Sequence, residues 1–431
     1  MAVAADRLPG RRSDRYLLGD NESSQRILEC AIEVIETQGE AAVRVARVAA
    51  MAGIAVPSVY HWFGSREGLV IAAHSERFRR NLSVLINPYR QALAESTTAA
   101  EFRVAILRAL ELVFDPSRSQ ARLTRLNVLG SATTRPELLS MVALRHKNLV
   151  EDVSAVIADG QTRGWVRRDH DADSLGLYLV CEVFAQVIIE FGASSLPRSR
   201  WVHLSRQTLS HVLFGTPVQH LGPHPVEAVR QDHRPDVPST AQRILDWAVE
   251  RIDDSGEASL RITELLGLGI SLTSIYHHFG SREHMVQAAQ AERFTQSQGA
   301  QMVQLEEMAG RCSTADEFAG MIRATCSDLF DEARAPTRRR RLSALGSLHG
   351  RPALAADIAG RENELAARGA HILEQGRRNG WLAPEVDSLA VSAWMMGLGL
   401  SRVLLEVIDI DADGAAWNRI ATEAVEAALG I

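Results

Sequence analysis

Two short segments of the chain carry the side chains whose types and spacing most clearly indicate a chemistry. The segments are Tyr60–Glu67 and Tyr276–Glu283. In each of them a tyrosine is followed directly by a histidine and, six positions after the tyrosine, by an arginine. Hydroxyl, imidazole and guanidinium groups donate hydrogen bonds to phosphate oxygens and to the edges of bases. This set of residue types therefore suits the recognition of a nucleic acid.

Residue sets that would support catalysis are absent from the sequence. The regions 85–215 and 301–431 contain no nucleophile elbow, Walker loop, paired Cys/His ligand set or Gly-rich dinucleotide turn. The four cysteines form no C-x-x-C pair, which argues against a disulfide framework and against a zinc finger. We therefore expect that the protein is not an enzyme and that it holds no metal and no cofactor.

The overall composition is that of a globular protein with a slightly acidic balance. The 431 residues are 46% hydrophobic and 23% charged, which suits large buried cores and excludes a disordered chain. Lysine and arginine number 47 against 53 acidic residues, so the net charge is −6. A uniformly basic nucleic-acid binder is thereby excluded, and contact with nucleic acid has to come from a local patch.

Segments that would direct the chain into or across a membrane are not evident. Met1–Ser24 carries charges throughout and lacks the apolar core of a secretory signal. The most apolar stretches, Leu175–Glu190 and Leu389–Glu406, are interrupted by Glu182 and by Arg402, respectively. Neither stretch reaches the roughly 18 uncharged residues that a spanning helix needs. We expect a soluble, cytoplasmic protein without a membrane partner.

The sequence contains a long internal repeat. The segment Tyr60–Glu67 recurs as Tyr276–Glu283, and matches at the same offset of 216 residues continue far downstream. The downstream matches are Leu129–Ser131 with Leu345–Ser347, Arg135–Pro136 with Arg351–Pro352, Gly164–Trp165 with Gly380–Trp381, and Trp201 with Trp417. A period of this length is too long for a solenoid repeat, so it indicates duplication of a complete protein.

The periodicity of apolar residues is helical in both copies. In Arg26–Gln38 the apolar positions follow the spacing of one helix face, and Gly39 ends the pattern. Strand-like alternation bounded by hairpin dipeptides is absent. Between the copies, Thr216–Pro238 holds five of the fourteen prolines and is therefore expected to be a linker. The sequence predicts an all-α protein.

The elements that would position the first tyrosine form a pair of short helices. Within Arg44–Phe63, small residues at Ala52–Ala55 separate two helical patterns, and Gly53 permits a positive φ in the turn. The second helix is expected at Val56–Phe63, where Pro57 is tolerated in the first turn. Two short helices joined by a glycine turn indicate a helix-turn-helix, whose second helix enters the major groove of DNA.

This pattern resembles the N-terminal DNA-binding domain of TetR-family transcriptional regulators. The likeness rests on the turn Ala52–Ala55, on the segment Val59–Glu67 and on the recurrence of that segment in the second copy. Each copy also has the size of a whole family member. The resemblance implies a three-helix DNA-binding domain followed by a larger helical domain that dimerises and binds a small effector.

On this resemblance the chain consists of two complete TetR-like units fused in tandem. The predicted divisions are a flexible arm at 1–23, helix-turn-helix domains at 24–84 and 239–300, helical regulatory domains at 85–215 and 301–431, and the linker at 216–238. The resemblance implies that the last two helices of each unit build a dimer bundle. We therefore expect the halves to pair within one chain, as a covalent pseudo-dimer whose operator need not be palindromic because the halves differ.

The resemblance also implies roles for individual side chains. Tyr60 and Tyr276 match a tyrosine that touches DNA phosphate, and Arg66 and Arg282 match a basic residue at the start of the next helix. The other candidate DNA contacts lie on the second helix or at the start of the helix before it, and are Arg44, Ser58, His61, Arg261, Thr273, Ser274 and His277. The apolar positions of the second helix are expected to be core, namely Val59, Trp62, Phe63, Ile275 and Phe279.

The second copy departs from the pattern in ways that predict weaker DNA binding. It is one residue shorter before the turn, around Gly267, and a lost helical residue rotates the following chain by about 100° unless the turn absorbs it. Residues 24–80 carry a net charge of +1, whereas residues 239–296 carry −3. Binding to phosphate depends on the number of cations. The first copy lacks the usual capping serine and has Ala55 in its place, whereas the second copy keeps Ser271.

Other polar residues have alternative interpretations. Asn127, Glu182 and Ser392 lie in apolar stretches, where they would either orient a ligand or be ordinary core or surface groups. The run Arg338–Arg341 is expected to be a solvated helix face paired with acids, the alternative being a contact with an acidic ligand or nucleic acid. The N-terminal arm, with Arg7, Arg11, Arg12 and Arg15, would either be flexible or enter a minor groove.

The leading hypothesis is a ligand-responsive DNA-binding transcriptional regulator, most simply a repressor. Its partners would be double-stranded DNA and a small-molecule effector. The alternative is a small-molecule-binding or protein-interaction module that has lost DNA binding in one or both heads. In an intermediate case only one helix-turn-helix domain of each chain binds DNA, and two chains associate so that two such domains are presented together. The sequence leaves open the operator, the effector, repression against activation, and association beyond the pseudo-dimer.

Overall fold

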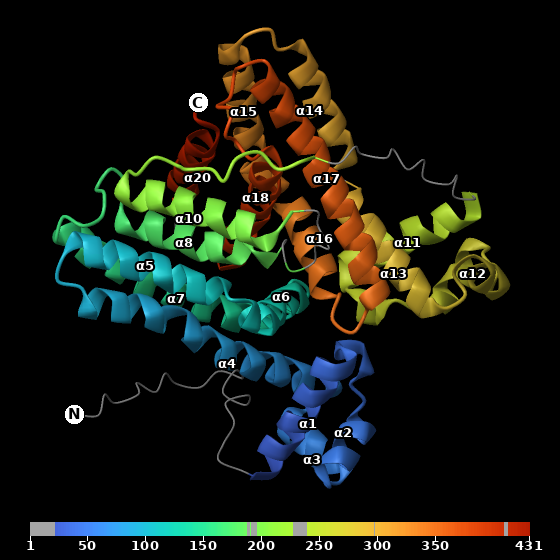
Figure 1. The fold of residues 1–431 in the computed structure, drawn as a ribbon. Helices are drawn as coiled ribbons and strands as arrows, with labels where there is room; N and C mark the ends of the chain where they lie inside the picture. Colours follow the sequence, from blue (N-terminus) through green and yellow to red (C-terminus); the bar gives the residue numbers. More distant parts are fainter. Residues whose placement is uncertain (1–21, 188–189, 191–195, 227–238, 297, 409–412) are drawn as a thin grey trace, which may run out of the picture.

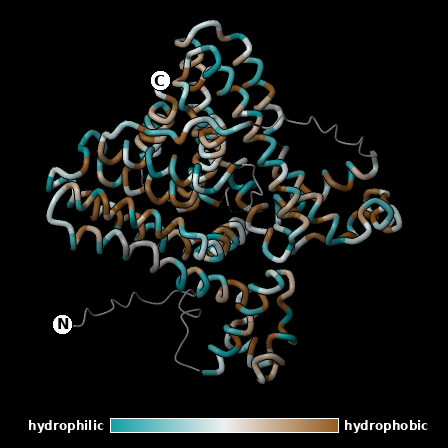
Figure 2. The backbone as a smooth tube through the Cα atoms, in the orientation of Figure 1, coloured by the Kyte–Doolittle hydropathy of each residue, from teal (hydrophilic) through white to brown (hydrophobic). Residues whose placement is uncertain are grey.

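The computed structural model describes residues 22–187, 190, 196–226, 239–296, 298–408 and 413–431. The described part is built from helices and connecting turns, and no strand occurs in it. The N-terminal arm with its four arginines and the linker residues 227–238 lie outside the described residues. Hydrophobic (brown) and hydrophilic (teal) residues are interspersed along the helices in Figure 2.

The first head is a small helical unit with its own core (Figure 1, blue). Its elements are α1 (Glu22–Gln38), η2 (Glu40–Ala42), α2 (Val45–Ala52), α3 (Val56–Phe63) and the start of α4 (Arg66–Glu95). Ile27, Val48 and Val59 are fully buried in this core. The predicted helix-turn-helix is therefore present, and its second helix has the expected bounds.

The first body begins on the same helix that ends the head. Helix α4 runs without interruption through residues 84 and 85, where the sequence predicts a domain boundary. The body adds α5 (Ala99–Phe114), η3 (Pro116–Arg118), α6 (Ser119–Ala132), α7 (Pro136–Thr162), α8 (Ala172–Ala185) and α10 (Arg198–Phe214). A rigid helix thus links the head to the helices behind it.

The elements of the second half follow the same order, with differences in the equivalents of α2 and α4 and with an additional described helix, α19. They are α11 (Ser239–Ser255), η4 (Glu257–Ser259), η5 (Ile262–Leu268), α12 (Leu272–Phe279), α13 (Arg282–Thr295), α14 (Gly299–Arg311), α15 (Ala315–Leu329), η6 (Glu332–Arg334), α16 (Ala335–Gly346), α17 (Pro352–Arg378), α18 (Ser388–Ser401), α19 (Val403–Ile408) and α20 (Gly414–Leu429). The equivalent of α2 is a 3-10 helix, and the equivalent of α4 is divided into α13 and α14.

The helices α14 to α20 form the second body, and α11 to α13 with η4 and η5 form the second head. The two bodies pack against each other through three pairs of equivalent helices. The pairs are α6 with α16, α8 with α18, and α10 with α20 (Figure 1). The backbones of α6 and α16 approach closely at Gly130 and Gly346, where a Cβ atom on Gly130 would lie 2.6 Å from the Cα of Gly346. The ion pairs Arg200–Asp387, at 2.5 Å, and Arg167–Glu423, at 2.7 Å, join the same faces. Buried residues of both bodies form one hydrophobic cluster.

One segment of the described chain, Ser388–Val407, is long and apolar enough to cross a membrane by length and composition. In the structure 83% of this segment is buried inside the protein. It comprises α18 and all of α19 except Ile408, and α18 packs on α8, α10, α17 and α20. Its apolar character therefore matches that of a core helix.

Candidate functional site

The recognition helix of the first head, α3, is held by one buried face. Val59 and Phe63 are buried, and Trp62 is half-buried against the same core. The turn before α3 contains Gly53 at φ 65°, ψ 34°, a conformation that glycine adopts without steric cost. The apolar side chains expected to be core in α3 thus fix its orientation on the head.

The opposite face of α3 is open. Tyr60 is 49% exposed, His61 is exposed and Ser58 is half-buried. Arg44, which immediately precedes α2, is also exposed, and its guanidinium donates to the carbonyl oxygen of Ala41 at 2.6 Å. These four candidate DNA contacts therefore lie where an external partner can reach them.

Arg66 has an additional role inside the head. Its Nε donates to the carbonyl of Val43 at 2.9 Å, and a terminal nitrogen donates to the carbonyl of Glu40 at 3.0 Å. The guanidinium therefore ties the start of α4 to the turn before α2. Arg282 does the same in the second head, where it donates to Leu260 and Glu257. Both arginines are half-buried, and their contact with phosphate stays a prediction.

The second head presents an equivalent open face. Tyr276 is 50% exposed, Thr273 and His277 are exposed, and Ile275 is fully buried. The hydroxyl of Ser271 caps α12 by accepting a hydrogen bond from the amide of Ser274 at 3.1 Å. Phe279 is half-buried at the edge of the core, and Arg261 is exposed at the start of η5.

The missing residue of the second head is compensated by tighter winding. An eight-residue α2 turns through about 800°, and a seven-residue 3-10 helix through about 840°. The two segments therefore differ by about 40° and not by the 100° of a deleted α-helical residue. Both end at a left-handed glycine, Gly53 and Gly269, and the following helices α3 and α12 start 216 residues apart.

The sequence of the first head matches a known protein family. Residues 27–73 match the model TetR_N, described as "Bacterial regulatory proteins, tetR family". Residues 27–73 are a TetR-family DNA-binding domain. The match ends within α4 and covers the helix-turn-helix, so DNA binding and transcription regulation are assigned to this part of the chain.

Several solved structures resemble this one. A TetR-family transcriptional regulator of Rhodococcus sp. is 21% identical, with 44% of this chain and 94% of that chain covered and a TM-score of 0.31. One from Mesorhizobium loti MAFF303099 is 13% identical, covering 47% and 99%, with a TM-score of 0.36. FadR of Bacillus subtilis in complex with stearoyl-CoA is 20% identical, covering 44% and 98%, with a TM-score of 0.29. These scores carry no argument about function. No curated protein matches the sequence.

A network of ionisable groups joins the first head to its body. The carboxylate of Glu40 accepts from His74 at 3.0 Å and from Ser131 at 2.8 Å, and it forms an ion pair with Arg135 at 2.5 Å. Burial opposes the charge, but the hydrogen bond from His74 and the charge of Arg135 hold the pKa of Glu40 well below its usual range. In the second head Glu257 occupies the same place, with Gln290 and Arg351 as partners.

Two of the three candidate ligand-orienting residues have partners within the protein. Asn127 accepts from Arg77 at 2.7 Å and donates to the carbonyl of Gly346 at 2.6 Å, so both ends of its amide have a partner within the protein. Glu182 is buried where α8, α10 and α18 meet, and it accepts from the indole of Trp394 at 2.8 Å and from the hydroxyl of Ser205. These partners suit the interpretation of Asn127 and Glu182 as ordinary core groups. Neither side chain lines the cavity of the second body described next, although Asn127 lines a separate hollow of about 530 Å³ between the two bodies.

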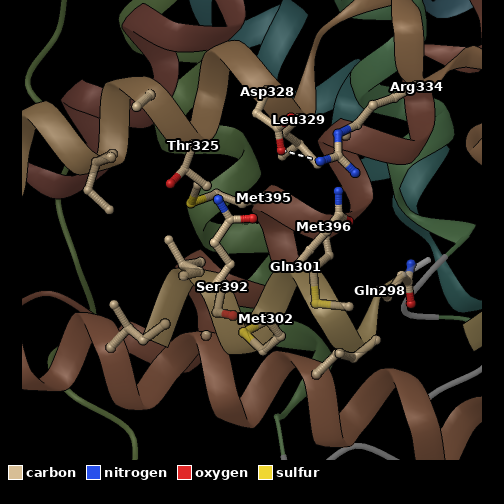
Figure 3. Close-up of a pocket in the computed structure, with 18 of the residues that line it drawn as sticks. Gln298, Gln301, Met302, Thr325, Asp328, Leu329, Arg334, Ser392, Met395 and Met396 are labelled. Carbon is tan, nitrogen blue, oxygen red and sulfur yellow. Dashed lines mark hydrogen bonds and ion pairs between the residues drawn. The ribbon is translucent and has the colours of Figure 1, made fainter. Parts of the chain in front are cut away.

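The third candidate, Ser392, lines a cavity of about 430 Å³ in the second body. Helices α14, α15, α16, α17 and α18 form its walls (Figure 3). The polar lining includes Gln301 and Thr325, and the ion pair Asp328–Arg334 lies at one end. The apolar lining includes the flexible side chains of Met302, Met308, Met395 and Met396.

The arginine run Arg338–Arg341 is only partly a solvated face. Arg338 and Arg341 are 3% and 6% exposed, and they form ion pairs with the buried carboxylates of Glu406 and Glu362. The expectation of paired acids is met, but the expectation of solvent exposure is wrong for these two. Residues three positions apart lie on the same face of a helix, so Arg338 and Arg341 both point into the protein when the apolar face of α16 packs inward. Among the residues that the structure describes, no His/Cys/Asp/Glu group could hold a metal ion.

The remaining cavity residues were not anticipated from the sequence. Thr325 and Asp328 stand at positions where the first copy has Ala109 and Leu112. A comparison of the two copies for positions that are polar only in the second would have found them. The same comparison would have found Gln301, which stands at the position of Leu85 in the first copy.

Proposed function

We propose that this chain is a one-component transcriptional regulator that binds double-stranded DNA through its first head and responds to a small molecule. The observation that carries the proposal is the TetR-family domain at residues 27–73, whose recognition helix leaves Tyr60 and His61 open to a partner. Exposed donors on a helix of this kind read DNA from the major groove. The expected outcome of binding is repression.

The chain acts as a covalent pseudo-dimer of two TetR-like units. The recurring order of elements and the packing of α8, α10, α18 and α20 support this arrangement. Joining the halves makes their association independent of protein concentration. Because the heads carry different side chains and charges, the operator is expected to consist of two unlike half-sites. The regulator acts in the cytoplasm.

A second candidate keeps DNA binding in the first head only. It is favoured by the net charge of −3 in residues 239–296, against +1 in residues 24–80. In this case the second half is a structural and sensory partner, or the chain is an interaction module if the first head is also inactive. A complete regulator would then pair two chains to present two first heads.

The test is DNA binding by the full chain and its tyrosine variants. Labelled genomic fragments from around the coding region are titrated with wild type, Tyr60→Ala and Tyr276→Ala, and the affinity is measured at several salt concentrations. Leu144→Ala, an exposed residue of α7, is the matched control and is expected to bind as wild type does.

Loss of at least tenfold in affinity for both tyrosine variants supports the pseudo-dimer. Loss for Tyr60→Ala alone supports the second candidate. An absence of specific, salt-dependent binding by wild type to any fragment of the genome contradicts both.

A further inference from the structure

We propose that the two halves have divided the work: the cavity of the second body is the effector site, and its occupancy is transmitted across the chain to the first head through α16 and α6. The proposal concerns regulation and rests on DNA binding by the first head. It differs from a symmetric pair, in which each half would sense for its own head. Three observations support it. The two bodies contain cavities of unequal volume, the charged groups around the larger of these two cavities are paired, and hydrogen bonds connect α16 to the first head without an equivalent connection from α6 to the second head.

The space in the two bodies is unequal. In the second body, α14 begins anew at Gly299 and brings Met302 and Leu305 to the cavity wall. In the first body α4 is continuous, and Tyr89 stands at the position of Leu305 and Val153 at that of Gly369. Tyr89 is 3% exposed, and it fills the space that the leucine leaves open.

What remains at the equivalent place in the first body is a void of about 10 Å³ with apolar walls. That volume holds at most one water molecule. A second hollow of about 170 Å³ lies nearby, against Arg122 and Arg125. Small-molecule sites usually occupy roughly 300–1,000 Å³, a range that includes the cavity of the second body and neither of these.

The charges around the large cavity indicate a neutral ligand. Each charged side chain in its lining has an ion-pair partner: Asp328 pairs with Arg334, Arg338 with Glu406, and Arg341 with Glu362. Two of these pairs, Arg338–Glu406 and Arg341–Glu362, are buried, and displacing the carboxylate from either of them by an anionic ligand would be costly.

The remaining lining consists of methionine and aliphatic walls together with hydrogen-bonding side chains (Figure 3). The hydrogen-bonding residues are Gln298, Gln301, Gln304, Thr325, Thr337 and Ser392. The ligand class is therefore an uncharged, largely apolar molecule with one or two hydroxyl, carbonyl or amide groups.

A chain of hydrogen bonds leads from this cavity to the first head. Helix α16 carries Arg338 and Arg341 in the cavity wall and ends at Gly346, whose carbonyl accepts from Asn127 of α6 at 2.6 Å. Asn127 accepts from Arg77 of α4 at 2.7 Å, and Arg77 lies 3.2 Å from the ring of His74. His74 binds Glu40 beneath the head, as described above.

Among the described residues, no equivalent chain of hydrogen bonds connects α6 of the first body to the second head. At the position of Asn127 the second body has Ser343, which lacks an amide to bridge two partners. Arg293, the equivalent of Arg77, binds Asp253 and Gln290 of its own half. A shift of α16 on ligand binding would therefore reach the first head, whereas α6 has no matching bridge to the second.

The binding step is tested with a matched pair of dyes on the full chain. N-phenyl-1-naphthylamine is neutral, and 1-anilinonaphthalene-8-sulfonate has the same rings with an added anionic group. We expect saturable binding of the neutral dye at one site per chain, with the sulfonate at least tenfold weaker. The variant Leu305→Tyr/Gly369→Val/Ser392→Gly copies the side chains of the first body and is expected to lower the affinity for the neutral dye at least tenfold. Unchanged affinity in this variant, or preference for the anion, overturns the assignment of the cavity.

The transmission step is tested with Asn127→Ser, which copies the second body. In wild type the neutral dye is expected to change the DNA affinity and the amide exchange of residues 56–63, whereas in the variant it binds equally well but changes neither. Coupling that persists in Asn127→Ser overturns the proposed path. If wild type binds no DNA, the proposed function fails, while the exchange of residues 56–63 still decides whether the cavity and the first head are coupled.

Discussion

At the scale of single residues, several arginines of this chain bind buried carboxylates and backbone carbonyls, so they add little to the free positive charge of the surface. Arg122 and Arg338 occupy equivalent positions, and each joins a buried glutamate, Glu190 or Glu406, to the backbone carbonyls at the end of the preceding helix. A planar guanidinium can satisfy several acceptors at once, which explains why arginine suits these places. Sequence counts of basic residues therefore overstate the charge that is free to meet phosphate.

Removing Arg66 is expected to loosen the first head. In Arg66→Ala the carbonyls of Val43 and Glu40 lose their donor, so the local free energy of unfolding should fall by about 2 kcal/mol. Amide hydrogen exchange in α1–α3 measures this local change. Arg282→Ala should have the same effect on α11 and α12, whereas Arg47→Ala, an exposed control on α2, should not. Unchanged exchange in Arg66→Ala would contradict the structural role.

The buried carboxyl of Glu182 is expected to make stability depend on pH. Burial raises its pKa to about 7 from 4.5, although hydrogen bonds from Ser205 and Trp394 favour the charged form. A raised pKa means that the folded chain holds the proton more tightly. The contribution of this carboxyl to stability is therefore complete below pH 4.5 and is lost as the pH rises towards 7.

The variant Glu182→Gln keeps an acceptor for both donors and cannot ionise. Its free energy of unfolding, relative to that of wild type, should therefore rise by roughly 3 kcal/mol between pH 4.5 and pH 8. Denaturant titrations at several pH values measure the difference. Parallel pH profiles for the two proteins would show that Glu182 does not titrate in this range.

At the scale of elements, the clearest difference between the halves is the 3-10 helix η5. It contains Gly267 and is followed by Gly269, and a Cβ atom at either position would meet no other atom within 4 Å. The two glycines differ in their backbone, because only Gly269 has a positive φ, of 71°. They therefore allow a test of backbone conformation without interference from packing.

Gly267→Ala is expected to raise the stability of the second head by about 0.5–1 kcal/mol, because alanine loses less conformational freedom on folding. Gly269→Ala is expected to lower it by about 1 kcal/mol, because an L-residue is strained at that φ. Amide exchange in α11 and α12 measures both changes. Equal effects of the two substitutions would contradict the helical ending at Gly269.

At the scale of the whole molecule, the packing of the two bodies depends on the crossing of α6 and α16. Gly130→Ala would place a Cβ atom 2.6 Å from the Cα of Gly346, where no flexible side chain can move aside. The helices must separate, and the bond from Asn127 to Gly346 is lost with them. We expect the melting temperature to fall by several degrees.

The matched control is Gly360→Ala, on the exposed face of α17, where a Cβ atom meets nothing within 4 Å. This control should leave the melting temperature unchanged or raise it slightly. A Gly130→Ala protein that melts with its control would show that the bodies can pack without the close crossing.

Much of the local architecture was predictable because it depends on short-range patterns. The bounds of the recognition helix, the positive φ of Gly53 and the burial of Val59 follow from apolar spacing and turn chemistry within about twenty residues of chain. The repeat and its internal identities indicated that both halves would use the same elements. Within the candidate DNA surface, Tyr60 and His61 are exposed as the predicted contacts require.

The partners of the polar residues were settled by tertiary structure alone. Asn127 and Ser392 look alike in sequence, as single polar residues in apolar stretches, yet one bridges α4 to α16 and the other lines a cavity. Which neighbour a side chain meets depends on how helices from distant parts of the chain cross. The periodicity of one helix carries no information about that crossing.

The sequence by itself thus determined the class of fold, the duplicated order of elements and the position of the helix-turn-helix, because each depends on residues close along the chain. Tertiary structure alone decided that Arg338 and Arg341 are buried, that Arg66 binds backbone carbonyls, and that a cavity of about 430 Å³ lies in the second body where the first body is filled. The physical reason is that cavities and buried ion pairs arise from what several packed helices leave unfilled or bring together. Residue 305 is leucine, whereas the equivalent residue of the first copy is Tyr89. This small difference affects the cavity only through the neighbouring side chains on four other helices.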